Sequence, residues 1–493
     1  MNRRDYLDFE LCIDKEGQQY KATVIRSPAG EASHTFTIPF SDLEVENFVL
    51  RLVATHRGMR RISSPEMQAA RQFGSKLFEA VFRGDVRVSF ASSQHEAKRQ
   101  GLGLRLKLRL DAADLINIPW EYLYDASLGR FLSLFEDTPI VRYIEMRGHT
   151  VPLSVEPPLS VLLMISSPRD YGELKVDRER ANVAAALGSL VDAGTLTITW
   201  MEEATLPALA TYLLRGRYHI FHFIGHGGFD EHSQDGVLVL EDAEGRGDLT
   251  SGERLAVLLG NHPTLRLVLL NACEGARTSR DDPFAGTATT LVRTGEVPAV
   301  VAMQFPITDQ AAITFAHGFY SALSAGRPVD AAVTQARLAI FAEGNDVEWG
   351  MPVLYMRAPD GHIFDVETRP SQEPAGPQRA PETATQKEEE IERQALEQHQ
   401  ALLESRYERA TTLMAEAHWS AAFELLKEIQ AVEPGYRDTS DLLDKAQAEA
   451  GLLEQCAARY TAAQKHLAAG RLAEAIAGFR AVLELDPAHG EAA

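Results

Sequence analysis

Short apolar runs alternate with longer amphipathic segments between residues 151 and 365. The runs are rich in Val, Ile and Leu and predict strands at 159–165, 196–200, 220–224, 265–270 and 298–303. The segments between them have apolar side chains at helical spacing and predict helices at 175–192, 205–216, 252–260 and 284–295. Apolar strands separated by helices are typical of a parallel sheet that is buried on both faces. Residues 151–365 are therefore predicted to form an α/β domain.

Residues 1–150 mix strand and helix periodicity. From Leu104 to Leu110, leucines alternate with Arg105, Lys107 and Arg109, which predicts a strand with one face in water. Residues 42–58 and 64–83 have helical spacing, and the second of these segments starts with a Ser-Pro pair typical of a helix entry. We therefore expect an α+β region before the α/β domain.

The composition changes again after residue 365. Residues 366–398 combine several prolines with a run of glutamates and almost no large apolar side chains, which is typical of a linker. Residues 399–493 have helical spacing, and the segment around Ala422 recurs around Ala475, an offset of 53 residues (475 − 422). We expect these residues to form an all-α tail of helix hairpins.

Part of this tail is similar to a known repeat. Gly470–Ala475, Phe479 and Pro487 resemble the second half of a tetratricopeptide repeat. The offset exceeds that family's period of about 34 residues, so we expect the hairpins to be separated by an extra helix. Two hairpins are fewer than the roughly three repeats that a stable array needs. We therefore expect the natural chain to continue beyond Ala493, or these helices to dock on another surface.

The chain is acidic as a whole. Its 493 residues carry 49 Lys and Arg against 70 Asp and Glu, a net charge of −21. A surface of this sign repels phosphate backbones and anionic lipid, so we expect no binding to nucleic acid. No apolar run approaches the roughly 20 residues that span a bilayer, and acids stand where a signal peptide needs an apolar core. Cys12, Cys273 and Cys456 form no paired spacing, so we expect a reduced, cytoplasmic protein without membrane attachment.

Two predicted strands end in residues with catalytic chemistry. The strand at 220–224 is followed by Gly225-His226-Gly227, and the strand at 265–270 by Asn271-Ala272-Cys273. Because the carboxyl ends of parallel strands meet at one rim of a sheet, His226 and Cys273 should face the same crevice. A thiol beside an imidazole has the layout of a nucleophile with its acid/base partner. The backbone N–H groups of Gly227 and Cys273 are candidates for an oxyanion hole.

His226-Gly227 and Asn271–Glu274 resemble the paired motifs of CHAT-domain cysteine peptidases, which are relatives of caspases and separase. The resemblance covers roughly residues 70–360 and is also carried by Ile118–Asp125, Gly129–Leu132, Thr138–Tyr143, Gly295–Met303, Asp330–Val333 and Ala336–Arg337. It implies a caspase-like three-layer sandwich with a mostly parallel sheet, preceded by the α+β region and followed by the all-α tail. It further implies Cys273 as nucleophile, His226 as general base and acid, and Gly227 as an oxyanion donor.

The same resemblance implies where substrate specificity is set. In separases, an acidic residue in the segment after the next strand favours Arg immediately before the cut. The corresponding segment is Gln304–Asp309. Thr308-Asp309 matches the last two positions of separase's Trp-Asp-Val-Thr-Asp, whereas Phe305-Pro306 replaces its Trp-Asp. Asp309 and Gln304 are therefore candidate pocket residues, with Asp282 as an alternative on the loop after Cys273. A basic preference is left open.

These observations favour a cysteine endopeptidase that cleaves a protein partner. The family's association with helical repeats and with bacterial stress or defence circuits implies that activity is held in check until a signal arrives, or until a regulatory protein binds the helical tail. The alternative is a catalytically dead caspase-like scaffold that binds partners through its helical repeats, because folds of this type also persist without activity.

Metal and nucleotide chemistry are less well supported by the sequence. His219, His222, His226 and His232 invite a zinc site, but 219 and 222 point to opposite faces of a strand and no acid or Cys lies at ligand spacing. The glycines around His226 lack the pattern of a phosphate-binding loop. We therefore expect no metal and no cofactor.

Overall fold

The computed structural model describes residues 6–54, 64–146, 150–172, 174–230, 235–272, 284–366, 404, 407–415, 418–432, 436–468 and 471–485. The chain divides into two compact units, Met1–Ser371 and Gln372–Ala493. The predicted linker lies outside the described residues except for its first residue, Val366. Within the described part, no helix combines the length and the apolar character needed to cross a membrane.

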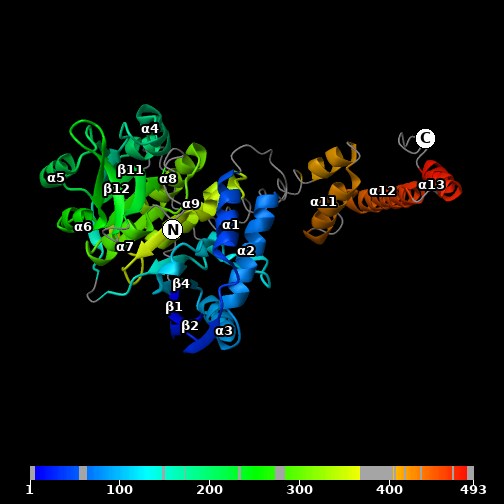
Figure 1. The fold of residues 1–493 in the computed structure, drawn as a ribbon, viewed down its shortest axis with the longest axis horizontal. Coiled ribbons are helices and arrows are strands. Elements are labelled where there is room, and N and C mark those ends of the chain that lie inside the picture. The colour runs from blue at the N-terminus through cyan, green and yellow to red at the C-terminus, as the bar shows by residue number, and fades with distance from the viewer. Residues whose placement is uncertain are drawn as a thin grey trace, which may run out of the picture. The chain divides into compact units, whose positions relative to one another are not determined.

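A single large sheet organises the first unit (Figure 1). Its strands lie in the order β10 (Leu196–Trp200), β9 (Leu159–Ile165), β11 (Ile220–Asp230), β14 (Leu267–Ala272), β15 (Ala299–Met303), β16 (Pro352–Met356), β7 (Ile140–Tyr143), β4 (Gly103–Leu110), β1 (Tyr6–Glu16), β2 (Gln19–Arg26) and β3 (Ala32–Phe36). A hairpin of β12 (Asp235–Glu241) and β13 (Gly247–Ser251) pairs with the end of β11. Each strand predicted between residues 151 and 365 has its counterpart in this sheet.

The sheet contains two parallel halves that run in opposite directions, and the antiparallel strands β2 and β3 extend it beyond β1. β10, β9, β11, β14 and β15 are parallel neighbours, and so are β16, β7, β4 and β1. The two halves meet where β15 pairs with β16 antiparallel, from Ala299↔Met356 to Met303↔Pro352. The carboxyl ends of the two halves therefore lie at opposite rims of the sheet. Strands from both sides of residue 150 belong to this one sheet. The predicted division into 1–150 and 151–365 stays a prediction.

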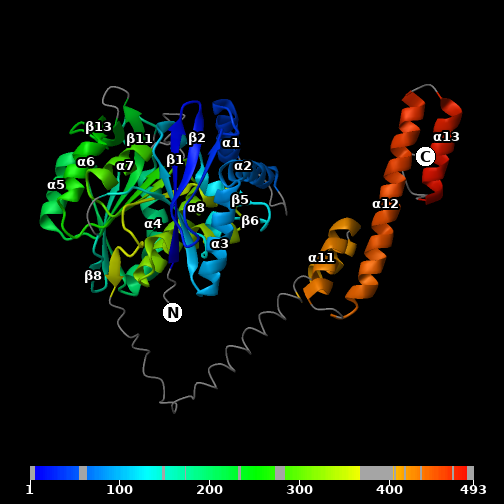
Figure 2. The ribbon, with the colours of Figure 1, turned by 90° about the horizontal axis from the view of Figure 1, so that it is seen from below.

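Helices cover both faces of the sheet (Figure 2). One apolar cluster contains side chains of α1 (Asp42–Ala54), α2 (Pro65–Val81), α3 (Asp85–Arg99), α4 (Val176–Asp192), α8 (Asp309–Ser324) and α9 (Val329–Ala342). A second contains those of α5 (Leu206–Arg215), α6 (Gly252–Gly260) and α7 (Ala285–Arg293). Along β11, Ile220 and Ile224 belong to the first cluster and Phe221 and Phe223 to the second, as expected for a strand buried on both faces. The fold is thus the predicted α/β three-layer sandwich.

The remaining elements of this unit are short. The strand pairs are β5 (Tyr124–Asp125) with β6 (Arg130–Phe131), and β8 (Leu153–Val155) with β17 (Phe364–Val366). The short helices are η1 (Ala113–Leu115), η2 (Trp120–Tyr122), η3 (Leu132–Leu134) and η4 (Glu348–Gly350).

The expectation that β4 has one face in water is wrong. Arg105 and Lys107 are each only 3% exposed, because carboxylates meet them inside the protein. Asp8 accepts hydrogen bonds from both side chains, at 3.0 and 2.7 Å, and Asp330 accepts one from Arg105. β4 lies between β1 and β7, so its polar side chains are buried and must be paired. The alternation in the sequence marks two buried faces, one apolar and one ionic.

A second buried ion pair lies at the junction of the two half-sheets. Arg142 of β7 donates to both carboxylate oxygens of Glu121 in η2, at 3.2 and 2.9 Å, and both side chains are almost fully buried. Gln304, which follows β15, donates to Glu121 and to the carbonyl of Gly350. Arg142 also donates to the hydroxyl of Tyr355 on β16, so the network ties β7, β15 and β16 together.

We predict that Glu121→Gln destabilises the first unit by about 3 kcal/mol or more, because it leaves the Arg142 guanidinium buried without its counter-charge. Urea unfolding followed by tryptophan fluorescence measures this loss. The matched control is Glu145→Gln, which breaks the ion pair of Arg109 with a carboxylate whose side chain is 62% exposed. That change should cost no more than about 1 kcal/mol. Equal losses for the two variants would contradict a structural role for the buried pair.

The second unit is helical, with α11 (Trp419–Val432), α12 (Thr439–Ala468) and α13 (Leu472–Leu485). α11 and α13 pack near opposite ends of α12 (Figure 2). The small residues Ala422 and Ala475 are both buried. The offset of 53 residues arises because one 30-residue helix, α12, serves both hairpins. The likeness to tetratricopeptide repeats stays a prediction.

Candidate active site

β11 and β14 are parallel neighbours, and their pairing defines the centre of the candidate site. The register runs from Ile220↔Leu267 to Gly225↔Ala272. Each residue of the last pair is followed directly in the chain by one of the two predicted catalytic residues, Gly225 by His226 and Ala272 by Cys273. Cys273 itself lies outside the described residues.

β11 continues beyond its pairing with β14 and holds His226 within a ladder. Past Gly225 it pairs antiparallel with β12, with His226 opposite Val239 and Gly227 opposite Leu238. Gly225 is needed at this branch point, since a Cβ there would lie 2.7 Å from the Phe223 ring and 3.1 Å from the Ser166 carbonyl oxygen. His226 is therefore held by strand geometry on a rigid element rather than on a free loop.

The imidazole of His226 is oriented by a backbone carbonyl. The side chain is 2% exposed, and its Nε2 lies 3.0 Å from the carbonyl oxygen of Gly172. A carbonyl only accepts hydrogen bonds, so Nε2 carries the hydrogen and Nδ1 of the neutral ring keeps its lone pair. Nδ1 is buried and has no hydrogen-bond partner among the described residues. The ring thus presents one basic nitrogen, as a general base requires.

The segment that supplies this carbonyl follows β9 and is fixed on both sides. Ser166 donates from its backbone N–H to the Ile224 carbonyl and from its hydroxyl to the Val239 carbonyl, at 2.9 and 2.8 Å. Asp170 accepts a hydrogen bond of 2.7 Å from the backbone N–H of Gly247. The ring of Tyr171 lies 5.5 Å from that of His226. Sequence reasoning missed Gly172, because a carbonyl that acts through the backbone leaves no residue-type signal.

The other predicted site residues are distributed over several elements. Gly227 is buried in β11 next to His226. Asp309 begins α8, which Thr308 caps by accepting from the Ala311 N–H, and Asp309 forms an ion pair with Arg178 of α4. Asp282 lies outside the described residues.

Gln304 lies in the buried network described above rather than beside His226. Its Nε2 donates to Glu121 and Gly350, and its Oε1 accepts from Arg142 at 3.3 Å. Both ends of its amide are therefore engaged by the protein. Within the described residues, no hydrogen bond or ion pair joins Gln304 or Asp309 to His226.

The neighbouring histidines are neutral groups of the interior. Burial lowers the pKa of His222 to about 3 and that of half-buried His219 to about 4. His222 Nδ1 lies 3.1 Å from the Tyr320 hydroxyl, and His219 Nδ1 accepts from the Ser160 N–H. In the described ranges, no three His, Cys, Asp or Glu side chains are grouped so that they would hold a metal ion. His232 lies outside these ranges.

Two further cysteines differ from a catalytic thiol. Cys12 donates to Asp111 at 3.3 Å, and burial, reinforced by this carboxylate, raises the pKa of its thiol to about 12. Cys456 is buried in α12. Cys12 thus stays protonated at neutral pH. Because only a thiolate attacks efficiently, it is a poor nucleophile.

Comparison with known proteins places the chain in a family. A protein-family model described as the CHAT domain matches residues 71–423. Among solved structures, the separase in the Saccharomyces cerevisiae separase–securin complex is 11% identical, with a TM-score of 0.42, over 71% of this chain and 30% of that chain. No curated protein matches the sequence significantly. Since the family match spans well over half of its residues, the chain belongs to the CHAT-domain family.

Proposed function

We propose that the protein is a cysteine endopeptidase with Cys273 as nucleophile and His226 as general base and acid. The observation that carries the proposal is the β11–β14 register, which ends at Gly225↔Ala272. Adjacent strands lie about 4.8 Å apart and successive Cα atoms about 3.8 Å apart. A residue bonded to Ala272 therefore starts within side-chain reach of the residue bonded to Gly225. The buried Nδ1 of His226, which has no hydrogen-bond partner in the described part of the chain, supplies the base for a thiol at that position.

The chemistry follows from the orientation of the imidazole. Nδ1 accepts the thiol proton, and the thiolate attacks the scissile carbonyl carbon to form a tetrahedral oxyanion, for which the N–H groups of Gly227 and Cys273 are the proposed donors. The imidazolium then protonates the leaving amine, and the acyl-enzyme is hydrolysed by a water that His226 deprotonates. The Gly172 carbonyl, 3.0 Å from Nε2, keeps the ring oriented during these steps by accepting the Nε2–H.

The partners and control of the enzyme belong to the same proposal. The substrate is a protein, and the helices of residues 399–493 bind a regulatory protein that releases the activity. The setting is a bacterial stress or defence circuit in the cytoplasm. The rival is a scaffold of the same fold that binds partners through its helices without cleaving them.

We expect Cys273→Ala to abolish cleavage and covalent labelling by a thiol-reactive peptide, with fold and partner binding unchanged. Intact-protein mass spectrometry of the full chain measures the covalent labelling, and circular dichroism measures whether the fold is unchanged. Cys12→Ala is the matched control and should label like wild type, because the raised pKa of Cys12 keeps its thiol unreactive. A chelator should leave labelling unchanged.

Labelling that follows Cys12 or Cys456 instead of Cys273 would contradict the assignment of the nucleophile. A wild-type protein that stays unlabelled at residue 273 under all activating conditions would favour the scaffold.

His226→Gln should slow peptide cleavage by about 10²–10⁴-fold, the usual contribution of a general base. It should also change how the alkylation rate of Cys273 depends on pH. Without the imidazole, we expect the rate to follow one titration near the ordinary thiol pKa of about 8.5, whereas the wild-type rate stays high at lower pH. His219→Gln is the matched control, because it removes the histidine that directly precedes β11. It should keep the wild-type profile. Identical profiles for His226→Gln and wild type would rule His226 out as the base.

The specificity proposal rests on Asp309. This carboxylate already pairs with the guanidinium of Arg178, so a basic side chain is the chemistry it accepts, and such a residue would have to displace Arg178.

We expect peptide-library cleavage, read by mass spectrometry, to show Arg or Lys immediately before the cut. Asp309→Asn should weaken this preference about tenfold or more, and Asp282→Asn should not. The reverse result would assign the pocket to Asp282, and an apolar preference would remove both residues from it.

A further inference from the structure

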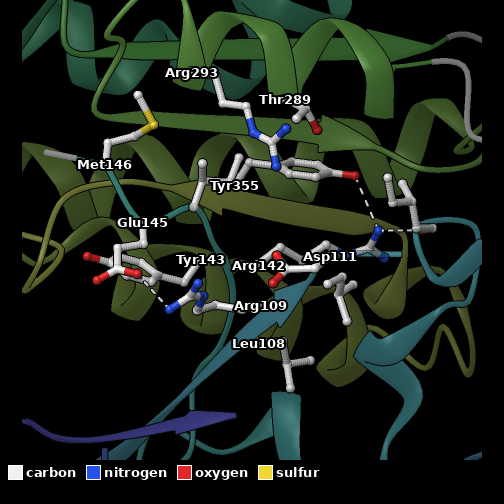
Figure 3. Close-up of a pocket in the computed structure, with 13 residues that line it drawn as sticks. Leu108, Arg109, Asp111, Arg142, Tyr143, Glu145, Met146, Thr289, Arg293 and Tyr355 are labelled. Atoms are coloured by element: carbon white, nitrogen blue, oxygen red, sulfur yellow. Dashed lines mark hydrogen bonds and ion pairs between the residues drawn. The ribbon is translucent and has the colours of Figure 1, made fainter. Parts of the chain in front are cut away.

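A cavity of about 450 Å³ lies at the rim of the sheet opposite to the candidate active site (Figure 3). It is lined by the carboxyl ends of β4 and β7, by Tyr355 of β16, and by Thr289 and Arg293 of α7. In an open α/β sheet, ligands collect beyond the carboxyl ends of parallel strands. Because the two half-sheets run in opposite directions, the second half has its own crevice, and this cavity occupies it. Its volume falls within the range of small-molecule sites.

Most charges that line the cavity are already paired. Arg142 is fully engaged with Glu121, with backbone carbonyls and with the Tyr355 hydroxyl. Arg109 donates to Glu145 at 2.7 Å and to Glu10 at 3.4 Å. These contacts leave Arg142 with few free N–H donors. Arg109 could bind a ligand only if its ion pair with Glu145 were broken.

Arg293 is different. It is the last residue of α7, and its side chain reaches from the helix toward the ring of Tyr355 in Figure 3. It forms no hydrogen bond or ion pair with any residue in the described part of the chain. An unpaired guanidinium at a cavity is the group that binds a carboxylate or phosphate by two parallel hydrogen bonds.

The rest of the lining selects the body of the ligand. Tyr143 and Tyr355 offer aromatic faces, and Ile116, Ile144 and Met146 offer apolar surface. Asp111, a hydrogen-bond acceptor for Cys12, places one negative charge at the same cavity. A second negative group on the ligand is therefore disfavoured there, and a hydroxyl or amine donor is favoured.

We propose that this cavity binds a small anion with an aromatic or apolar body, its carboxylate or phosphate paired with Arg293. The site is separate from peptide cleavage, since it opens at the opposite rim of the sheet from His226. α7 connects the two rims: Phe284, just before its first turn, packs against Phe223 of β11, and Arg293 ends it at the cavity. The proposal does not depend on the proposed peptidase activity, because binding alone tests it.

Isothermal titration and ligand-observed NMR on the full chain test the proposal with two matched pairs of probes. The first is 4-hydroxyphenylacetate against its neutral amide, and the second is AMP against adenosine. We expect at least one anion to bind about tenfold or more tightly than its neutral counterpart, as a charge-assisted pair implies. The first pair reports a carboxylate ligand and the second a phosphate ligand.

Three variants locate the binding. Arg293→Gln should remove the advantage of the anion, and Glu145→Gln should tighten binding severalfold because it frees Arg109. Arg246→Gln, at an exposed arginine paired with Asp242, is the control and should bind like wild type. Thermal melts confirm that each variant is folded.

Equal binding of the charged and neutral probes, an unchanged affinity in Arg293→Gln, or no binding of either anion at millimolar concentration would each overturn the proposal.

Discussion

The antiparallel pairing of β15 with β16 is the constraint on which the functional geometry depends. It joins two parallel half-sheets side by side with their strands in opposite directions, so the carboxyl ends of each half lie at a different rim. The half that contains β11 and β14 places its strand ends at His226, and the other half places its ends at the cavity beside Arg293. The buried Arg142–Glu121–Gln304 network lies across this junction. If Glu121 or Arg142 lost its partner, the remaining buried charge would destabilise the junction between β15 and β16.

His226 illustrates how much of a site backbone alone can build. Its position is set by two ladders, one to β14 that ends at Gly225 and one to β12 that begins at His226. Its tautomer is set by the carbonyl of Gly172, which accepts the Nε2–H and leaves the lone pair on Nδ1. The segment with Gly172 is in turn held through Ser166 and Asp170 by hydrogen bonds to main-chain groups. The imidazole is therefore preorganised by groups that need no particular side chain at position 172.

This division of labour explains what was predictable from the sequence. The strands and helices from Leu159 to Met303 follow from period and apolar content, because both faces of the sheet are buried and the runs are short. The place of His226, directly after the stretch of β11 that pairs with β14, follows from the same pattern, whereas Cys273 lies outside the described residues. Arg105 and Lys107 were misplaced in water because the alternation of β4 carries no information about the carboxylates of Asp8 and Asp330, which are distant in sequence. The extension of β11 to Asp230 was missed because its glycines carry no hydrophobic signal.

Charge is distributed unequally between the two halves of the sheet. Around the candidate active site, β11 and β14 are flanked by apolar clusters, and His222 and His219 are kept neutral by burial. In the other half, Arg105, Lys107 and Arg142 are buried and each is met by a carboxylate. An apolar environment strengthens the charges that would develop in the proposed acyl transfer. Fixed ion pairs near the other rim suit the proposed recognition of a charged ligand. Arg293 stands out because it belongs to the charged half and lacks a partner among the described residues, and α7 carries it there from the half that holds His226.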